Sequence, residues 1–203
     1  MWSYEKRLQF PVNIKNKDPR LARIIISQYG GPDGEMGASM RYLSQKFAFK
    51  NPRVAGILND VGTEELAHLE MVGAIVHQLT ANLTPEEIKA GGFEQYYVDH
   101  TLGIWPQAAG GVPFNACEFQ SKGDPITDLF ENMAAEQKAR TTYDNILRMI
   151  KDPDVAAPIK FLRQREIVHF QRFGEALRMV QDELDSKNFY AMNPDFDCSN
   201  CFK

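Results

Sequence analysis

The sequence has few cysteines, no excess of basic residues and no long apolar run. Its 203 residues include three cysteines, Cys117, Cys198 and Cys201. A small odd number argues against a disulfide framework and is typical of a reducing compartment. The formal net charge of −4 gives no basic patch for nucleic acid. No apolar stretch approaches the roughly 18 residues of a membrane span, so we expect neither nucleic acid nor membrane as a partner.

The N-terminal residues also lack the apolar core of a secretory signal, because residues 1–7 are aromatic and charged. We therefore expect synthesis in the cytoplasm without a signal peptide. The length suits one domain with a substantial core. Apolar residues make up 43% and charged residues 25%, which is typical of a globular protein. We expect a single domain over 1–203, with an extended arm at 1–18, a helical bundle at 19–184 and a short tail at 185–203.

Two Glu-x-x-His sequences occur within long segments of helical periodicity. Glu65 and His68 lie in the segment from residue 54 to residue 79, and Glu166 and His169 lie in the last long segment. Positions i and i+3 share one face of an α-helix, so each pair can point at one spot. One such pair is a weak signal, because surface helices are rich in glutamate.

The two motifs belong to a degenerate internal repeat. Glu35 lies 30 residues before Glu65, and Glu136 lies 30 residues before Glu166, so the halves match with a shift of 101 residues. The same shift relates three further pairs: Ala38 and Ala139, Tyr42 and Tyr143, and Gly73 and Gly174. Two helices then supply one Glu each, and two supply Glu-x-x-His. This is the ligand pattern of a two-metal carboxylate site in a ferritin-like bundle.

The periodicity and capping residues predict an all-α, ferritin-like four-helix bundle. We expect a first helix at 19–29, interrupted at 30–34 and resumed near Glu35 until residue 51. The second helix is expected at about 52–83, the third from Pro125 to about 150, and the fourth from the turn at 151–154 to about 184. The Thr84 to Glu87 sequence is a capping box that predicts a short helix ending at 91–92.

The segment 91–123 lacks helical periodicity and is rich in glycine and proline. A connection of this length is unusual in a compact domain unless it has a role. In a four-helix bundle it can be the long crossover that lets the second and third helices run parallel. It could also form a wall or lid over one end of the bundle.

The acidic residues of the repeat predict metal ions. Glu166 and His169 stand in an otherwise apolar stripe, and the upstream glutamate of each half has a comparable inward position. A buried carboxylate must be neutralised, paired or bound to a cation. Arg140 and Lys46 are candidates to pair with one or two of the four carboxylates. Two divalent ions would neutralise the four negative charges, and each ion would also bind one imidazole. Oxygen-rich ligands of this kind favour manganese or iron.

Other residues leave alternatives open. Tyr42 and Tyr143, two turns after the upstream glutamates, could hydrogen-bond the ligand carboxylates or simply pack in the core. Cys198 and Cys201 could form half of a zinc site, a redox pair or a cross-linking handle, and an inert tail is the preferred interpretation. The metal site itself could be a decayed one. The remaining histidines, His77 and His100, have no such context.

With these residues in place, the chain resembles the manganese catalases. Within that family it is most similar to the short, CotJC-type spore-coat form, over nearly the whole chain to about residue 184. Longer members carry a C-terminal extension that this sequence lacks. The residues that carry the resemblance are Gly34-Glu35-Met36, the segment from Thr63 to Glu70, Ala135-Glu136 and the segment from Arg165 to His169.

The resemblance implies two manganese ions, with iron as the alternative. The ligands would be Glu35, Glu65, His68, Glu136 and His169, with Glu65 bridging the ions. Glu166 would stand beside the ligands and handle protons, although the repeat makes it equivalent to Glu65 and would allow a second bridge. Tyr42, Tyr143 and Arg140 are expected to support the ligand carboxylates from behind.

The implied reaction is the disproportionation of hydrogen peroxide to water and dioxygen. The resemblance also implies a homo-oligomer, a hexamer in the family, located in the spore coat with other coat proteins as possible partners. Two competing hypotheses are a di-iron oxidase or peroxidase of the ferritin-like group, and a structural coat protein with a vestigial metal site.

Overall fold

Residues 7–185 are described by a computed structural model, and the regular elements in that range are helices, apart from one isolated β-bridge between Gln107 and Pro113. The all-α class predicted from the sequence is confirmed. The predicted tail and its cysteines Cys198 and Cys201 lie outside the described residues. None of the helices within 7–185 is long and apolar enough to cross a membrane.

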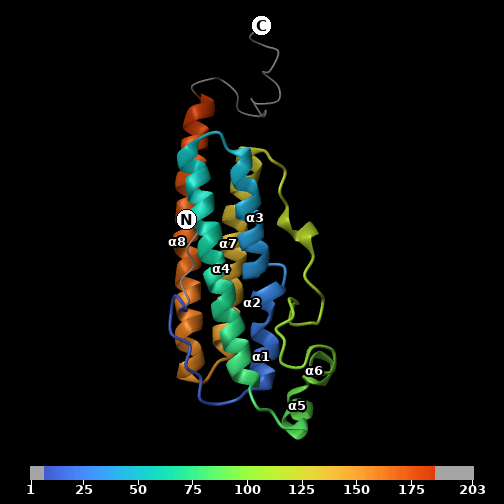
Figure 1. The fold of residues 1–203 in the computed structure, drawn as a ribbon. Coiled ribbons are helices and arrows are strands. Elements are labelled where there is room, and N and C mark those ends of the chain that lie inside the picture. Colours follow the sequence, from blue (N-terminus) through green and yellow to red (C-terminus); the bar gives the residue numbers. More distant parts are fainter. Residues whose placement is uncertain (1–6, 186–203) are drawn as a thin grey trace.

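Four helical columns form the bundle. The first column consists of α1 (Pro19–Ile25), α2 (Ser27–Gly30) and α3 (Glu35–Gln45), and a short 3-10 helix, η1 (Lys46–Ala48), follows it. The others are α4 (Pro52–Thr80), α7 (Pro125–Met149) and α8 (Pro153–Asp185). Figure 1 shows α4 and α7 running in one direction and α3 and α8 in the other. Since α3 packs chiefly on α4, and α7 on α8, each half of the sequence repeat forms one helical hairpin.

The starts of the bundle helices follow from local sequence. An Asp or Asn side chain caps the first turn by accepting a backbone N–H, and a proline occupies the first helical position, where no N–H is needed. The three capped pairs are Asp18-Pro19, Asn51-Pro52 and Asp124-Pro125. These starts match the predicted ones. The second helix ends at Thr80 rather than near 83, because Ala81 is extended and Asn82 has a left-handed φ of 55°.

Glycines break the first column immediately before Glu35. A Cβ on Gly30 would lie 2.4 Å from the backbone of Pro106, so the crossover can approach here only because residue 30 has no side chain. A Cβ on Gly31 would lie 2.4 Å from the carbonyl oxygen of Ser27. The helix therefore restarts at Glu35, which places this side chain in the first turn of α3.

The segment between α4 and α7 is more helical than the sequence indicated. The predicted helix α5 (Pro85–Gly91) has the expected capping box. The crossover also contains α6 (Glu94–His100) and a 3-10 helix, η2 (Ala116–Phe119), neither of which was predicted. Helix α6 has only seven residues, too few to reveal a period. It is stabilised by tertiary contacts instead, since the Tyr96 hydroxyl donates to the Gly103 carbonyl and accepts from the Trp105 N–H.

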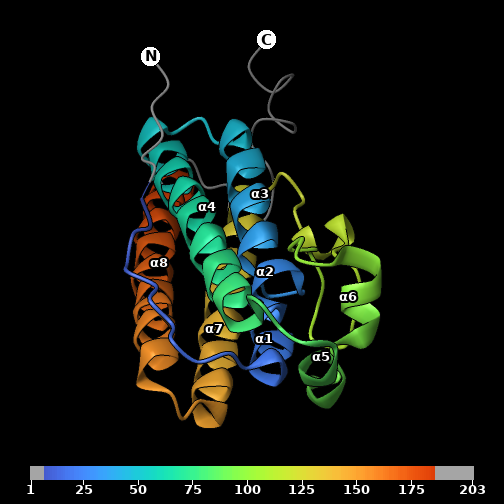
Figure 2. The same ribbon diagram turned by 60° about the horizontal axis from the view of Figure 1, so that its bottom comes forward.

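The N-terminal arm, residues 7–18, has no helix and crosses the face formed by α4 and α8 (Figure 2). Phe10 stacks on Phe161 of α8 with the ring centroids 4.9 Å apart. Gln78 of α4 fixes the backbone of the arm with both ends of its amide. It accepts the Ile14 N–H at 2.7 Å and donates to the Val12 carbonyl at 2.8 Å.

Two apolar clusters make up the core, one toward each end of the bundle. The first contains α4 residues 71–79 and α8 residues 155–162, and the second contains α4 residues 54–61 and α8 residues 173–184. Along both helices the gap between the clusters holds a Glu-x-x-His motif. The core is therefore divided by a buried polar layer.

Gln78→Ala should detach the arm, because both of its hydrogen bonds to the backbone of residues 12–14 are lost. We expect the free energy of unfolding to fall by about 1–3 kcal/mol, measured by urea denaturation. Gln171→Ala, at an exposed position of α8, is the matched control and should change little. Equal stability of the two variants would contradict the prediction.

Candidate metal centre

The polar layer contains six side chains from four helices. Each of the six exposes 2% or less of its surface. Five of them were predicted as ligands from the sequence, and the sixth, Glu166, as a proton-handling neighbour. They are Glu35 of α3, Glu65 and His68 of α4, Glu136 of α7, and Glu166 and His169 of α8. The structure brings all six together.

Glu65 stands at the middle of the cluster. Its Oε2 atom lies 2.7 Å from Nδ1 of His68, and its Oε1 atom lies 2.7 Å from Nδ1 of His169. The two imidazole rings are stacked with their centroids 5.4 Å apart. Each Nδ1 atom also faces one upstream glutamate, Glu35 at 3.8 Å from His68 and Glu136 at 3.5 Å from His169. The result is two equivalent sets of one glutamate and one histidine that share a single carboxylate.

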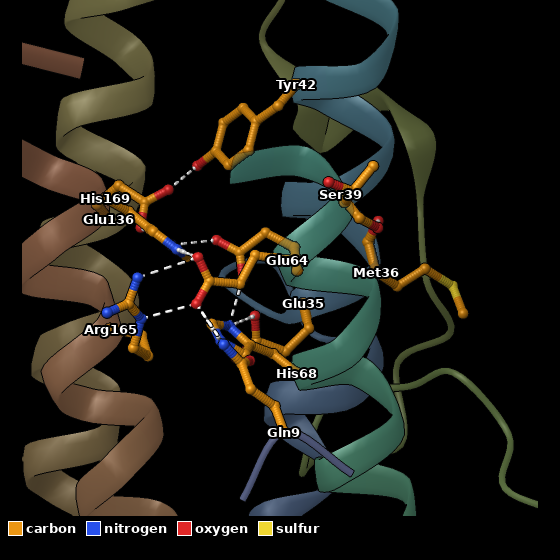
Figure 3. Close-up of polar contacts among 12 residues, drawn as sticks. Gln9, Glu35, Met36, Ser39, Tyr42, Glu64, His68, Glu136, Arg165 and His169 are labelled. Carbon is orange, nitrogen blue, oxygen red and sulfur yellow. Dashed lines mark hydrogen bonds and ion pairs between the residues drawn. The ribbon is translucent and has the colours of Figure 1, made fainter. Parts of the chain in front are cut away.

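The two tyrosines connect the halves of the repeat. The Tyr42 hydroxyl donates to Glu136 (Figure 3). The Tyr143 hydroxyl donates to Glu35, so each tyrosine supports the glutamate of the other half. Both rings are fully buried, and Tyr42 also packs edge-on against Phe173. Burial, reinforced by the facing carboxylate, raises the pKa of both phenols well above the ordinary value. Both hydroxyls therefore remain protonated hydrogen-bond donors. The two tyrosines support the ligand carboxylates as well as packing in the core.

Arg140 and Lys46 do not reach the cluster. Arg140 lies at a half-exposed position, where it donates to Asp144 at 2.7 Å and to Gln137 at 2.9 Å. Lys46 donates to Asn59 at 2.7 Å. These nearby surface partners keep the two cations in contact with water, whereas burial beside the ligands would cost their hydration. Arg140 was predicted to support the ligand carboxylates, but its contacts are with Gln137 and Asp144 instead.

Glu64 is a part of the site that the sequence interpretation missed. Its carboxylate lies beside the outer nitrogen of both rings, 3.0 Å from Nε2 of His169 and 3.6 Å from Nε2 of His68 (Figure 3). Arg165 of α8 and Gln9 of the arm donate to it as well. One signal was available in the sequence. Glu64 and Arg165 are repeat-equivalent positions with opposite charges, 101 residues apart.

In the absence of metal, protons shared among the side chains offset the negative charge of this cluster. Burial, together with the charge of Glu65, raises the pKa of Glu35 to about 8. Burial and the neighbouring carboxylates hold the pKa of Glu166 well above its ordinary value. Burial also opposes ionisation of Glu65, but the two imidazoles outweigh it and lower the pKa of this carboxyl group. Groups that share protons in this way exchange them readily for divalent cations, because metal ligands bind in their deprotonated forms.

Several buried polar atoms of the cluster have no hydrogen-bond partner. They are Oε1 of Glu65, Nε2 of His68, Oε2 of Glu136, Oε1 of Glu166 and Nδ1 of His169. The Glu65 and His169 atoms approach to 2.7 Å without the alignment of a hydrogen bond. Unpaired buried polar atoms are costly, and coordination to a cation would satisfy those of Glu65, Glu136, Glu166 and His169, whereas Nε2 of His68 faces Glu64. One atom each from Glu65, His68, Glu166 and His169 lies within 4.8 Å of the others. The residues therefore fit metal ions, and their oxygen-rich set fits manganese or iron.

A small cavity of about 10 Å³ connects this layer with residues at the break before α3. It reaches Glu35, Glu136 and Glu166 on its inner side and Asp33 at its outer side. Small residues line the passage between α3 and α7: Gly34, Ala38, Ala135 and Ala139. A volume of this size suits a molecule about as large as water.

Comparison with known proteins agrees with this geometry. The family described as manganese containing catalase matches residues 1–190. Protein CotJC of Bacillus subtilis is 47% identical over 190 residues, which cover 94% of this chain and all of that protein. A probable manganese catalase of Clostridium acetobutylicum is 34% identical over 93% of this chain and 85% of that one. The crystal structure of KatB, a manganese catalase from Anabaena PCC7120, superimposes with a TM-score of 0.82 at 31% identity, over 89% of this chain and 81% of that chain.

Glu65→Gln should reduce metal binding at both positions, because one side chain contacts both imidazoles. We expect elemental analysis to find about two manganese or iron ions per wild-type chain and fewer than about one in the variant. Glu70→Gln is the control, since Glu70 lies on the exposed face of the same helix. A variant that retains the wild-type metal content would rule out the shared role of Glu65.

Proposed function

Because this chain belongs to the manganese catalase family, we propose that it disproportionates hydrogen peroxide to water and dioxygen at a pair of manganese ions. Glu35, Glu65, His68, Glu136 and His169 would hold the ions. One observation carries the proposal: two repeat-related sets of one glutamate and one histidine face a single shared carboxylate in a sealed layer of the core. The choice of manganese over iron rests on the family.

The reaction requires equal numbers of protons to be taken up and released. Reduction of one peroxide to two water molecules consumes two protons and two electrons, and oxidation of a second peroxide to dioxygen releases the same number. Bound manganese would supply the electrons by cycling between the two-valent and three-valent states of the pair. The protein has to accept and return the protons.

Glu166 is the residue best placed for the proton transfers. It lines the cavity, its Oε1 atom has no hydrogen-bond partner, and burial together with the neighbouring carboxylates raises its pKa, which favours the protonated form. A general acid and base works best when it can both give and take a proton at the working pH. Tyr42 and Tyr143 would hold Glu136 and Glu35 in position from behind.

Access through the small cavity would restrict the substrate. Because its volume is close to that of a single water molecule and its lining includes glycine and alanine, it would favour the smallest substrates, such as peroxide, over larger organic molecules. The surrounding apolar clusters also keep bulk water away from the centre. Both features suit a reaction whose substrate and products are all very small.

We further propose that the protein works as a homo-oligomer in the spore coat. The resemblance to the short spore-coat form supports this location, as does 47% identity to CotJC over the whole of that protein. The oligomer is carried over from the family. Other coat proteins would then be its neighbours.

An oxygen electrode separates this function from its competitors. Wild-type protein with bound manganese is expected to release one dioxygen for every two peroxides consumed. A peroxidase would need a reductant and release no dioxygen, and a purely structural coat protein would do neither. Peroxide loss without dioxygen from the metal-loaded protein would refute the proposal.

Glu166→Gln should lower kcat by roughly 10²–10⁴-fold, because the amide cannot transfer a proton. The metal content should remain near that of the wild type, since all five proposed ligands are retained. Steady-state oxygen release and elemental analysis of the same sample provide the two measurements. A variant with wild-type kcat would exclude Glu166 as the proton carrier.

Ala139→Leu tests the passage. The added side chain should fill the cavity and lower kcat/KM for peroxide by roughly 10–100-fold at unchanged metal content. Ala134→Leu on the exposed face of the same helix is the matched control. If both variants turn over peroxide like the wild type, substrate reaches the centre by another route.

A further inference from the structure

Both imidazoles of the cluster have the same orientation. The inner nitrogen, Nδ1, of each ring faces the shared Glu65 carboxylate. The outer nitrogen, Nε2, of each ring faces Glu64, at 3.0 Å for His169 and 3.6 Å for His68. The two histidines thus lie between two consecutive glutamates of α4, with Glu65 on the ligand side and Glu64 behind. Figure 3 shows Glu64 beside both rings.

An outer carboxylate of this kind has a known physical effect on a metal-binding histidine. It accepts the N–H of the nitrogen that does not bind metal, which fixes the tautomer and the ring orientation and makes the other nitrogen a stronger ligand. A carboxylate has two oxygen atoms, so one side chain can accept from two rings. Here Oε2 of Glu64 lies within hydrogen-bond distance of Nε2 of His169, and Oε1 lies 3.6 Å from Nε2 of His68, slightly beyond that distance.

The carboxylate of Glu64 is itself fixed from two other elements. Arg165 of α8 donates to both of its oxygen atoms, at 2.7 Å from Nε and 3.1 Å from Nη2. Gln9 of the arm donates to Oε1 at 2.7 Å. A two-pronged arginine contact orients a carboxylate better than a single hydrogen bond. The guanidinium also cancels the charge of Glu64, so the support adds no net charge to a layer that already holds four carboxylates.

We propose that Glu64 is a positioning residue for both metal ions, and that Arg165 and Gln9 fix the orientation of its carboxylate. It would orient His68 and His169 together so that each presents Nδ1 to its own ion. The inference rests on the proposed two-metal centre but not on catalase activity. It also explains the asymmetry of the repeat, because two glutamates or two arginines at these equivalent positions would repel each other instead of forming the pair.

The test is a titration of metal-depleted protein with manganese(II) chloride, followed by electron paramagnetic resonance. Glu64→Gln keeps the shape of the side chain, but its amide has one acceptor oxygen and can serve only one ring. We expect at least one ion to bind roughly 10–100-fold more weakly and the signal of coupled ions to give way to that of single ions at equal loading. Glu70→Gln, exposed on the same helix, should behave like the wild type.

A double variant separates orientation from charge. Glu64→Gln combined with Arg165→Gln restores the charge balance without restoring the second acceptor. We expect it to bind manganese as weakly as Glu64→Gln alone. Recovery of wild-type affinity in the double variant would overturn the positioning role, because charge alone would then explain the loss.

The remaining outcomes are also decisive. A wild-type chain that takes up no manganese ends the two-metal proposal before any variant is compared. A wild-type chain that binds two ions, beside a Glu64→Gln variant of equal affinity and equal signal, overturns only the inference about Glu64.

If circular dichroism shows that Glu64→Gln does not fold, Arg165→Lys is the second variant, because it keeps the charge and loses the two-pronged contact. It should weaken binding in the same direction, and unchanged affinity there would overturn the inference.

Discussion

The burial of four carboxylates and two imidazoles between two apolar clusters is the constraint on which the rest of the structure depends. Isolated buried charges are too costly for a fold of marginal stability, so each of these groups needs a partner. Glu65 meets both imidazoles, and the tyrosines meet the outer glutamates. Several polar atoms of this layer, on Glu65, Glu136, Glu166 and His169, are left without hydrogen-bond partners. A pair of cations is the simplest way to satisfy them.

The repeat gives the centre an approximate twofold symmetry, and its chemistry depends on departures from that symmetry. Glu65 contacts both histidines, whereas its equivalent, Glu166, keeps a free oxygen atom beside the cavity. Glu64 lies behind both rings, whereas its equivalent, Arg165, donates to Glu64. One member of each pair therefore holds the centre together. The other would be free for the proposed proton transfer in the first pair and for charge balance in the second.

Elements outside the bundle also act on the centre. Gln9 of the arm donates to Glu64, and the crossover packs directly against Gly30, just before the first column breaks and restarts at Glu35. The far end of the crossover is fixed by Asp128, which is fully buried and accepts the backbone N–H groups of residues 122 and 123. These segments have little periodicity, yet they contact Glu64 and the helix break that precedes Glu35.

Local patterns were enough to predict the all-α bundle and the six side chains that converge in it. Helical spacing places Glu65 with His68 on one face, and the repeat copies that face onto α8, so both features follow from the chain itself. Helix α6, the crossed tyrosine contacts, the role of Glu64 and the diversion of Arg140 to Asp144 were decided only by the tertiary structure. Each depends on which groups from distant segments come within hydrogen-bond distance, and a periodicity along one helix carries no information about the helix that packs against it.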